Sequence, residues 1–400
     1  MNYRSRVIEL REYRPLDLPA SALSNTEAAI LDREYRSQIQ IEPPSFRNNH
    51  QWRLTSLGWV GFIPLTDDLA FRLQPKVPLR SLFGMWEYAY RLKSFRFLEG
   101  ITDVETLEEF YEKLANILAK QVLNRARQGF YRSYISQQEA LPYLRGRLDA
   151  YRAVRRPWDV QLPCQFEEHT ADIEDNQILA YTLWRIARSG VCTERVLPTV
   201  RQAYRSLQVF TSFRPFSADD CMGRRYHRLN QDYQPMHALS RFFLEQTGPT
   251  HRAGERQITP FLVDMARLFE AFVATWLEQN LPENWWVQPQ ETLYFGKGHR
   301  QKFMIDLVLR RVDADLPVMV LDTKYKIPDE PSTEDIAQVV SYAEGLGCTE
   351  AVLVYPSPLT YPLDDYIGKI HVRTLTFALD DDLDKAGQDF LSSLGINPSR

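Results

Sequence analysis

The stretch Val318-Met319-Val320-Leu321-Asp322-Thr323-Lys324-Tyr325-Lys326 decides how the rest of the chain is interpreted. Its apolar run is typical of a strand buried on both faces. Such a strand does not end in charges without a use for them, because an unpaired carboxylate or ammonium is costly to remove from water. Asp322 and Lys324 are two residues apart, so on a strand their side chains share one face. An acid that holds Mg²⁺ beside a lysine that stabilises phosphate charge would use this pair, and a solvated strand end is the ordinary alternative.

A second apolar strand with an acid in its middle lies upstream. It runs from Lys302 to Leu309, and Asp306 is its central acid. The polar segment 310–317 between the two strands is typical of a turn, so we expect an antiparallel hairpin. That hairpin would bring Asp306 close to Asp322.

Two amphipathic segments flank the hairpin. Residues 261–280 have apolar side chains at helical spacing, and Glu270 interrupts them beside the apolar face. Downstream, Ser332 and Thr333 can cap a helix that runs through Gly345. On that helix Gln338 and Tyr342 are spaced i, i+4, so their side chains share a face.

The order of these elements resembles the PD-(D/E)xK nuclease superfamily: a helix with Glu, a strand with Asp, a strand with Asp-x-Lys and a helix with Gln. In detail the chain resembles the McrC family, the nuclease subunits of modification-dependent McrBC restriction systems. The residues that carry this resemblance are Leu268–Val273, Ile305–Leu309, Leu321–Lys326 and Asp335–Ala343, and elements at Leu73–Pro78 and Arg145–Arg147 also resemble the family. The usual proline before the first acid is Ile305 here, which leaves Asp306 in place.

The resemblance implies a metal-dependent endodeoxyribonuclease that uses Mg²⁺, for which Mn²⁺ is expected to substitute. A metal of this kind is held by one or two carboxylates, with water and phosphate as its other ligands. We expect Asp306 and Asp322 to be metal ligands, and Glu270 to bind the metal directly or through water. Thr323 is expected to add its backbone carbonyl, with its side chain pointing away from the site.

Two further residues are expected to act on the reacting groups. Lys324 is expected to orient the attacking water or to stabilise the transition state. Gln338 is expected to position water or phosphate. Lys326 shares the strand face of Lys324, and contact with DNA and simple solvation are both open for it.

The resemblance also implies a partner. McrC proteins work with McrB, a AAA+ GTPase whose attached domain recognises the DNA site; they dock on it through their N-terminal region and stimulate GTP hydrolysis. This sequence has no Gly-x-x-x-x-Gly-Lys-Ser/Thr motif, and its nearest segment, Phe295–His299, lacks the spacing and the hydroxyl. We therefore expect no nucleotide on this chain itself, and a McrB-type AAA+ GTPase and double-stranded DNA as its partners.

Two other classes of function stay open. One is a stand-alone PD-(D/E)xK nuclease of repair or defence. The other is a non-catalytic adapter of a AAA+ ring, against which the intact set of Asp306, Asp322 and Lys324 weighs, because a decayed site has little reason to keep buried charges.

Charge is divided unevenly along the chain. Residues 255–400 contain 13 basic and 23 acidic residues, a net charge of −10, whereas the rest contains 35 basic and 29 acidic residues, a net charge of +6. Of those 35 basic residues 31 are Arg, which suits bidentate contacts with phosphate, although solvated helix surfaces explain them equally well. Arg145 and Arg147 share this ambiguity between a phosphate contact and a turn with solvated side chains.

Other features indicate where the protein works. No apolar run approaches the roughly 18 residues that a membrane span needs, and the first residues carry no leader pattern. The four cysteines are scattered, without the paired spacing of a zinc or redox motif. We expect a cytoplasmic protein with no membrane partner.

The order of the segments predicts an α+β multidomain protein. Residues 1–80 are expected to be a strand-rich partner-docking region, a small barrel or curled sheet. Residues 81–254 are expected to be mainly helical with a basic surface. Residues 255–400 are expected to form the PD-(D/E)xK (restriction-endonuclease-like) α/β domain with a mixed sheet. The boundary is placed in Thr247–Arg256, and the acidic tail from Asp380 is expected to be peripheral.

Overall fold

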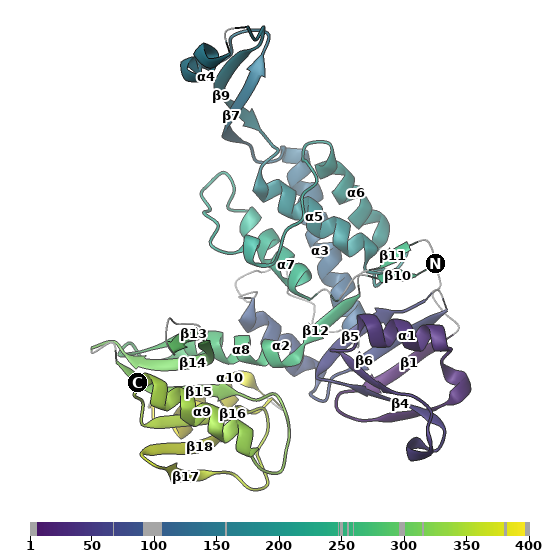
Figure 1. Ribbon diagram of the computed structural model, residues 1–400, viewed down its shortest axis with the longest axis vertical. Coiled ribbons are helices and arrows are strands. Elements are labelled where there is room, and N and C mark those ends of the chain that lie inside the picture. The colour runs from purple at the N-terminus through teal and green to yellow at the C-terminus, as the bar shows by residue number, and fades with distance from the viewer. Residues whose placement is uncertain are drawn as a thin grey trace. The chain divides into compact units, whose positions relative to one another are not determined.

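A computed structural model describes residues 6–66, 68–90, 106–156, 158–246, 248, 251–253, 256–258, 260–295, 301–313, 316–379 and 382–396 (Figure 1). Contacts divide the chain into two compact units. One is Phe110–Glu245; the other joins Asn2–Glu109 to Gln246–Arg400. The two ends of the chain thus share a unit, whereas the sequence predicts three consecutive regions. The predicted boundary, Thr247–Arg256, lies partly outside the described residues; within and beside it β10 (His251–Ala253) pairs antiparallel with β11 (Arg256–Ile258).

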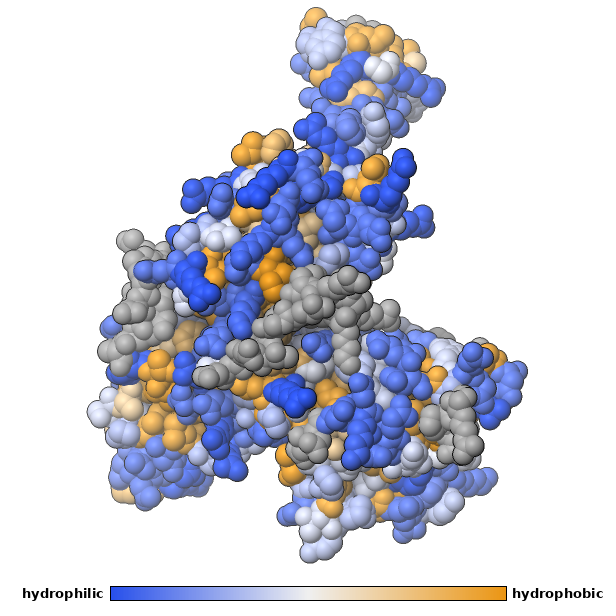
Figure 2. Space-filling model, turned by 180° about the vertical axis from the view of Figure 1, so that it is seen from behind, coloured by the Kyte–Doolittle hydropathy of each residue, from blue (hydrophilic) through white to orange (hydrophobic). Residues whose placement is uncertain are grey.

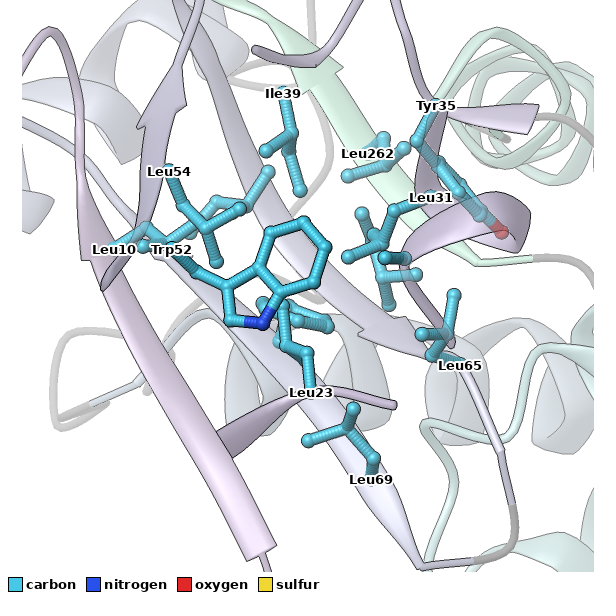
Figure 3. Close-up of a cluster of buried hydrophobic side chains, with 14 residues drawn as sticks. Leu10, Leu23, Leu31, Tyr35, Ile39, Trp52, Leu54, Leu65, Leu69 and Leu262 are labelled. Carbon is cyan, nitrogen blue, oxygen red and sulfur yellow. The ribbon is translucent and has the colours of Figure 1, made fainter. Parts of the chain in front are cut away.

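Two small sheets, rather than the single barrel or curled sheet expected, form the N-terminal part. Their strand orders are β1-β6-β5-β12 and β2-β4-β3. The elements are β1 (Arg6–Arg11), β2 (Leu16–Pro19), α1 (Asn25–Glu34), β3 (Ile39–Glu42), β4 (Gln51–Ser56), β5 (Trp59–Pro64), β6 (Leu69–Gln74) and β12 (Phe261–Asp264). Alternate apolar side chains of these strands meet α1 in one core, where Leu10, Leu31, Trp52 and Leu262 lie together (Figure 3). The helix α2 (Leu79–Ala89) follows.

The strand β12 corrects the prediction of a helix from residue 261. Residues Phe261–Asp264 are extended and pair antiparallel with β5, and the helix α8 begins only at Met265 and ends at Asn280. The Asp264 side chain accepts hydrogen bonds from the amides of Ala266 and Arg267, which caps the helix. The apolar spacing continues without a break from strand to helix, so periodicity alone did not mark the boundary.

The unit Phe110–Glu245 consists of helices and one small sheet. Its elements are α3 (Leu107–Gln128, which begins just before the unit), β7 (Ser133–Leu141), β8 (Arg147–Leu148), α4 (Ala150–Arg155), β9 (Leu162–Thr170), α5 (Glu174–Arg188), α6 (Leu197–Gln208) and α7 (Tyr233–Glu245). The sheet, in the order β7-β9-β8, carries α4 and extends away from the helices of this unit (Figure 1). Among the described helices of the protein, none is both long and apolar enough to cross a membrane.

A mixed six-stranded sheet forms the C-terminal part, in the order β13-β14-β15-β16-β18-β17. The strands are β13 (Trp285–Phe295), β14 (Gln301–Arg311), β15 (Pro317–Thr323), β16 (Glu350–Tyr355), β17 (Asp364–Ile367) and β18 (Ile370–Thr376). β14 and β15 form the predicted antiparallel hairpin, with Leu307 opposite Leu321. β15 then pairs parallel with β16, which requires the crossover helix α9 (Thr333–Leu346).

The helix α9 forms where the capping pattern predicts it. The Ser332 side chain accepts a hydrogen bond from the Asp335 amide, and the helix ends at Gly347 in the left-handed conformation (φ 73°). Val339 and Ala343 of α9 pack in one buried cluster with Val320 of β15 and Leu353 of β16. Since side chains alternate along a strand, Asp322 lies on the same face of β15 as Val320, toward α9.

The expectation of a peripheral tail is wrong for its described residues 382–396. The helix α10 (Leu383–Leu394) packs with α8 around Phe377: the ring centroid of Phe377 lies 4.9 Å from that of Phe272 and 5.2 Å from that of Phe390. A Cβ atom on Gly387 would lie 2.1 Å from the Trp276 ring, so the two helices approach closely. The sequence of this tail is rich in acidic residues, and for that reason the apolar face of α10 was not predicted.

Candidate active site

The two acids predicted on the hairpin lie beside each other. The pairing of Leu307 with Leu321 places Asp306 next to the end of β15. Both the backbone amide and the side-chain hydroxyl of Thr323 donate to Oδ2 of Asp306, each at 2.8 Å. The Thr323 side chain therefore faces Asp306, which corrects the expectation that it points away. Asp322 is almost fully buried, with 1% of its surface exposed.

Lys324 joins the strand to α9. Its Nζ lies 2.6 Å from Oδ2 of Asp322 and donates to Oε1 of Gln338 at 3.0 Å. The amide nitrogen of Gln338 in turn donates to the Tyr342 hydroxyl at 2.6 Å. The predicted shared faces, Asp322 with Lys324 and Gln338 with Tyr342, are thus both present, and the lysine lies where the two meet.

Glu270 approaches the acids from α8. Burial and the negative charge of Asp306 raise the pKa of the Glu270 carboxyl group. Nε2 of Gln290 donates a hydrogen bond to Oε1 of Glu270 at 3.3 Å. Gln290 lies in β13 between two residues paired with β14, Pro289 opposite Leu307 and Glu291 opposite Ile305. Its φ of 51° is unusual for a residue other than glycine, and backbone strain of this kind concentrates at functional sites. No sequence signal marked Gln290.

Burial and repulsion from Asp306 make the carboxyl groups of Asp322 and Glu270 hard to ionise. Burial, followed by the charge of Asp306, raises the pKa of Asp322 to about 6 and that of Glu270 to about 7. Burial lowers the pKa of Lys324, but the charges of Asp322 and Asp335 outweigh this effect and leave that pKa above its ordinary value. The ion pair with Lys324 therefore offsets the burial of Asp322 and its repulsion by Asp306 only in part.

The donor set fits a small divalent cation. Oδ2 of Asp322 is buried and receives no well-oriented hydrogen bond despite the nearby ammonium group. Across the residues that the structure describes, no group of three or more His, Cys, Asp or Glu side chains converges to hold a metal by itself. Mg²⁺ suits a site with one or two carboxylates, because it keeps several water ligands.

Asp335 belongs to the same group of side chains and was not predicted. It is 8% exposed, forms an ion pair with Lys326, and its Oδ1 lies 3.6 Å from Nζ of Lys324. Burial raises the pKa of Asp335, but the hydrogen bond from Lys326 and the other contacts outweigh it and leave that pKa below its ordinary value. Lys326 is therefore paired with an acid. The spacing of Asp335 three residues before Gln338 was the available signal.

Arg145 and Arg147 belong to the other unit. The Arg145 guanidinium lies 4.0 Å from the centroid of the Phe166 ring and 3.6 Å from a Glu168 oxygen. Gly146 between them has φ 68°, and a Cβ there would lie 2.4 Å from the Gln165 carbonyl oxygen. This is a tight turn in which Arg145 is held by its own sheet.

Comparison with known proteins gives one family. A family model described as "McrBC 5-methylcytosine restriction system component" matches residues 54–356, more than half of the chain. No curated protein matches.

Two solved structures from Thermococcus gammatolerans resemble the chain. One is described as a refined half-complex from a tetradecameric assembly of McrB AAA+ hexamers with bound McrC; the match has 17% identity and a TM-score of 0.54, and covers 98% of this chain and 99% of that chain. The other is the cryo-EM structure of the McrBC complex, with 18% identity and a TM-score of 0.42, covering 70% of this chain and 89% of that chain. The first likeness supports a shared fold across almost the whole length.

Proposed function

This chain belongs to the McrBC family of 5-methylcytosine restriction system components, and from that premise we propose that it is the DNA-cleaving subunit of such a system. The observation that carries the proposal is the convergence of Asp306, Asp322 and Lys324 at one end of β15, with Lys324 Nζ 2.6 Å from Asp322. Placing the half-buried carboxylate of Asp306 beside the buried carboxylate of Asp322 carries an electrostatic cost, which a bound cation would remove.

In this proposal each residue has one role. Asp306 and Asp322 would hold Mg²⁺ through their carboxylate oxygens, and Thr323 would add its backbone carbonyl. Glu270 would reach the metal through water, because the three carboxylates do not converge closely enough among the described residues for all of them to bind it directly. Mg²⁺ bound there supplies charge neutralisation on the phosphate and activation of water. The fold of β15 supports the set because the carboxylates come from adjacent strands and need no flexible segment to meet.

Lys324 and Gln338 serve the reacting phosphate. If Asp322 held Mg²⁺, that carboxylate would no longer need the Lys324 ammonium, which would then be available to stabilise the negative charge that develops on phosphate oxygens in the transition state. Gln338 keeps its amide in place through the Tyr342 hydroxyl and orients water or phosphate. Asp335 holds Lys326 and limits how far Lys324 can swing from the strand.

The partner in this proposal is a AAA+ GTPase, because the related T. gammatolerans structure contains McrB AAA+ hexamers with bound McrC. The N-terminal region 1–80 is the docking element that the sequence resemblance implies.

A second candidate for the surface that docks the GTPase lies in the β7-β9-β8 sheet and α4. Three large apolar side chains in and just after α4 are strongly exposed: Val154 (78%), Trp158 (77%) and Val160 (91%). This end of the β7-β9-β8 sheet carries apolar surface at the top of Figure 2. Exposed apolar surface of this kind marks interaction sites.

Cleavage by the full-length chain, assembled with its AAA+ GTPase on plasmid DNA that contains 5-methylcytosine, tests the proposal. We expect Asp322→Ala and Lys324→Ala to abolish cleavage and to leave GTPase stimulation intact. Asp365→Ala, in the same sheet but exposed on β17, is the matched control and keeps cleavage. Cutting at the wild-type rate by either site variant would refute the proposal. Stimulation of the GTPase without any cleavage by the wild type would favour an adapter, and full cleavage without the GTPase would favour a stand-alone nuclease.

A further inference from the structure

A polar cluster connects the N-terminal sheets to the segment that directly follows the active-site strand β15; its centre, Glu12 and Tyr325, is buried, and its outer member, Tyr13, is 47% exposed. Its members are Glu12 and Tyr13 after β1, Lys76 after β6, and Tyr325, which directly follows Lys324. Oε2 of Glu12 accepts hydrogen bonds from the Lys76 backbone amide at 2.9 Å and from the Tyr325 hydroxyl at 3.2 Å. Glu12 is 3% exposed and Tyr325 is 4% exposed, so these groups have left water to meet each other.

Lys76 holds both the ring and the backbone of Tyr325. Its Nζ lies 3.9 Å from the centroid of the Tyr325 ring and donates to the Tyr325 carbonyl oxygen at 3.3 Å. A cation over an aromatic face is worth most where water is excluded. The same Nζ lies 4.9 Å from the Tyr13 ring, so one ammonium group is placed between two tyrosines.

The strained backbone of Tyr13 indicates that the surrounding structure fixes its ring beside Lys76. Tyr13 has φ 57°, a left-handed conformation that bulky residues rarely adopt. Its hydroxyl fills the space over Gly58, where a Cβ would lie 2.3 Å from that oxygen. Strained residues of this kind persist only where the surrounding structure determines them.

Tyr325 is connected to the active-site residues on two sides. Directly after β15, Lys324 and Lys326 both pair with Asp335 of α9. The Lys326 amide donates to the Lys324 carbonyl at 2.8 Å, so the chain makes a tight turn at Tyr325. On the other side, the Tyr325 ring lies 6.0 Å, between centroids, from Phe269, the residue before Glu270. A shift of Tyr325 would therefore move Lys324 directly and Glu270 through its neighbour.

We propose that Glu12 and Lys76 are positioning residues for the active site: by clamping Tyr325 they hold Lys324 and Glu270 in place, so the site is complete only with the N-terminal sheets in contact. This inference rests on the proposed nuclease function. It also means that a fragment beginning near residue 255 keeps Asp306, Asp322 and Lys324 but lacks the side chains that hold them.

Three variants of the full-length chain in its GTPase complex test this clamp, by which we mean the contacts of Glu12 and Lys76 with Tyr325. Lys76→Met removes the ammonium group, Lys76→Arg keeps a cation, and Tyr325→Phe keeps the ring but loses the bond to Glu12. We expect Lys76→Met and Tyr325→Phe to lower the cleavage rate at saturating DNA and Mg²⁺ by roughly tenfold or more, since a displacement of about 1 Å can cost about a hundredfold. Lys76→Arg should recover most of that rate. Arg53→Met, which breaks an exposed ion pair with Asp17 elsewhere in the N-terminal sheets, is the matched control.

Hydrogen exchange in the metal-free chain supplies a readout that does not depend on cleavage. The amides of Lys324 and Lys326 should exchange about tenfold faster in Lys76→Met and Tyr325→Phe, and not in Arg53→Met. Wild-type exchange and cleavage in both clamp variants, with Asp322→Ala inactive, would overturn the clamp and leave the nuclease proposal standing. Wild-type cleavage by Asp322→Ala would instead overturn the nuclease proposal. Because Tyr325→Phe changes one hydroxyl, it keeps the test valid if Lys76→Met fails to fold.

Discussion

Thr323 donates both its amide and its hydroxyl to Oδ2 of Asp306, each at 2.8 Å. One oxygen of the acid on β14 is thereby satisfied by the residue between Asp322 and Lys324 on β15. The middle position of Asp-x-Lys is thus not a passive spacer here, because it orients the neighbouring carboxylate.

Thr323→Val removes the hydroxyl and keeps the shape of the side chain. We expect metal affinity, measured by calorimetric titration with Mn²⁺, to fall about tenfold, the size typical for groups that orient a metal ligand. Thr323→Ser keeps the hydroxyl and should stay close to the wild type. Equal affinity in the Val and Ser variants would show that the amide alone orients Asp306.

Metal dependence follows from the oxygen-ligand site. We expect cleavage to require Mg²⁺ or Mn²⁺, whereas Ca²⁺ should bind without supporting good catalysis, because its larger and more flexible coordination does not suit a small site. Cleavage assays in each metal, with Mg²⁺ restored after chelation as the control, measure this. Full activity in excess chelator would contradict the assigned roles of Asp306 and Asp322.

The raised pKa of Glu270, about 7, makes stability depend on pH. A carboxyl group whose folded pKa lies above its unfolded value destabilises the metal-free fold increasingly as pH rises from the unfolded pKa, near 4.5, through 7. Glu270→Gln should therefore raise the Tm at pH 8 by about 2 °C, on the scale that roughly 1 kcal/mol produces in a large domain.

That gain in Tm should vanish at pH 4.5, where the wild-type carboxyl group is already protonated. Mg²⁺ at pH 8 should raise the Tm of the wild type more than that of the variant, because the cation relieves the same repulsion. Thermal unfolding at the two pH values measures both effects. A gain in Tm of the same size at both pH values would mean that the charge of Glu270 is not its cause.

The two candidate docking elements make opposite predictions about partner binding. Trp158→Ser and Val160→Ser remove apolar surface near α4, and Phe46→Ser removes a side chain in the N-terminal region that is 91% exposed. All three positions are exposed, so these changes should leave stability within about 0.5 kcal/mol.

If the β7-β9-β8 sheet docks the GTPase, the first two variants should weaken binding at least about tenfold, since interface aromatics are frequent hot spots. Calorimetric titration with the GTPase decides between the elements. Loss of binding in Phe46→Ser alone would assign docking to the N-terminal region.

Short-range pattern by itself determined the hairpin of β14 and β15, the common face of Asp322 and Lys324, and the common face of Gln338 and Tyr342. Each depends on residues a few positions apart, where the repeat of a strand or helix dictates which side chains meet. The resemblance to McrC rested on these same residues, and the family assignment is confirmed.

Only the tertiary structure decided which distant segments meet. It joined β12 to β5, packed α10 on Trp276, and brought Gln290 to Glu270. It also joined Glu12 to Tyr325 across 313 residues. Closing a long loop costs little more than closing a short one, so chain distance neither favours nor forbids such contacts. They depend on the burial of whole surfaces, which no local pattern of residues contains.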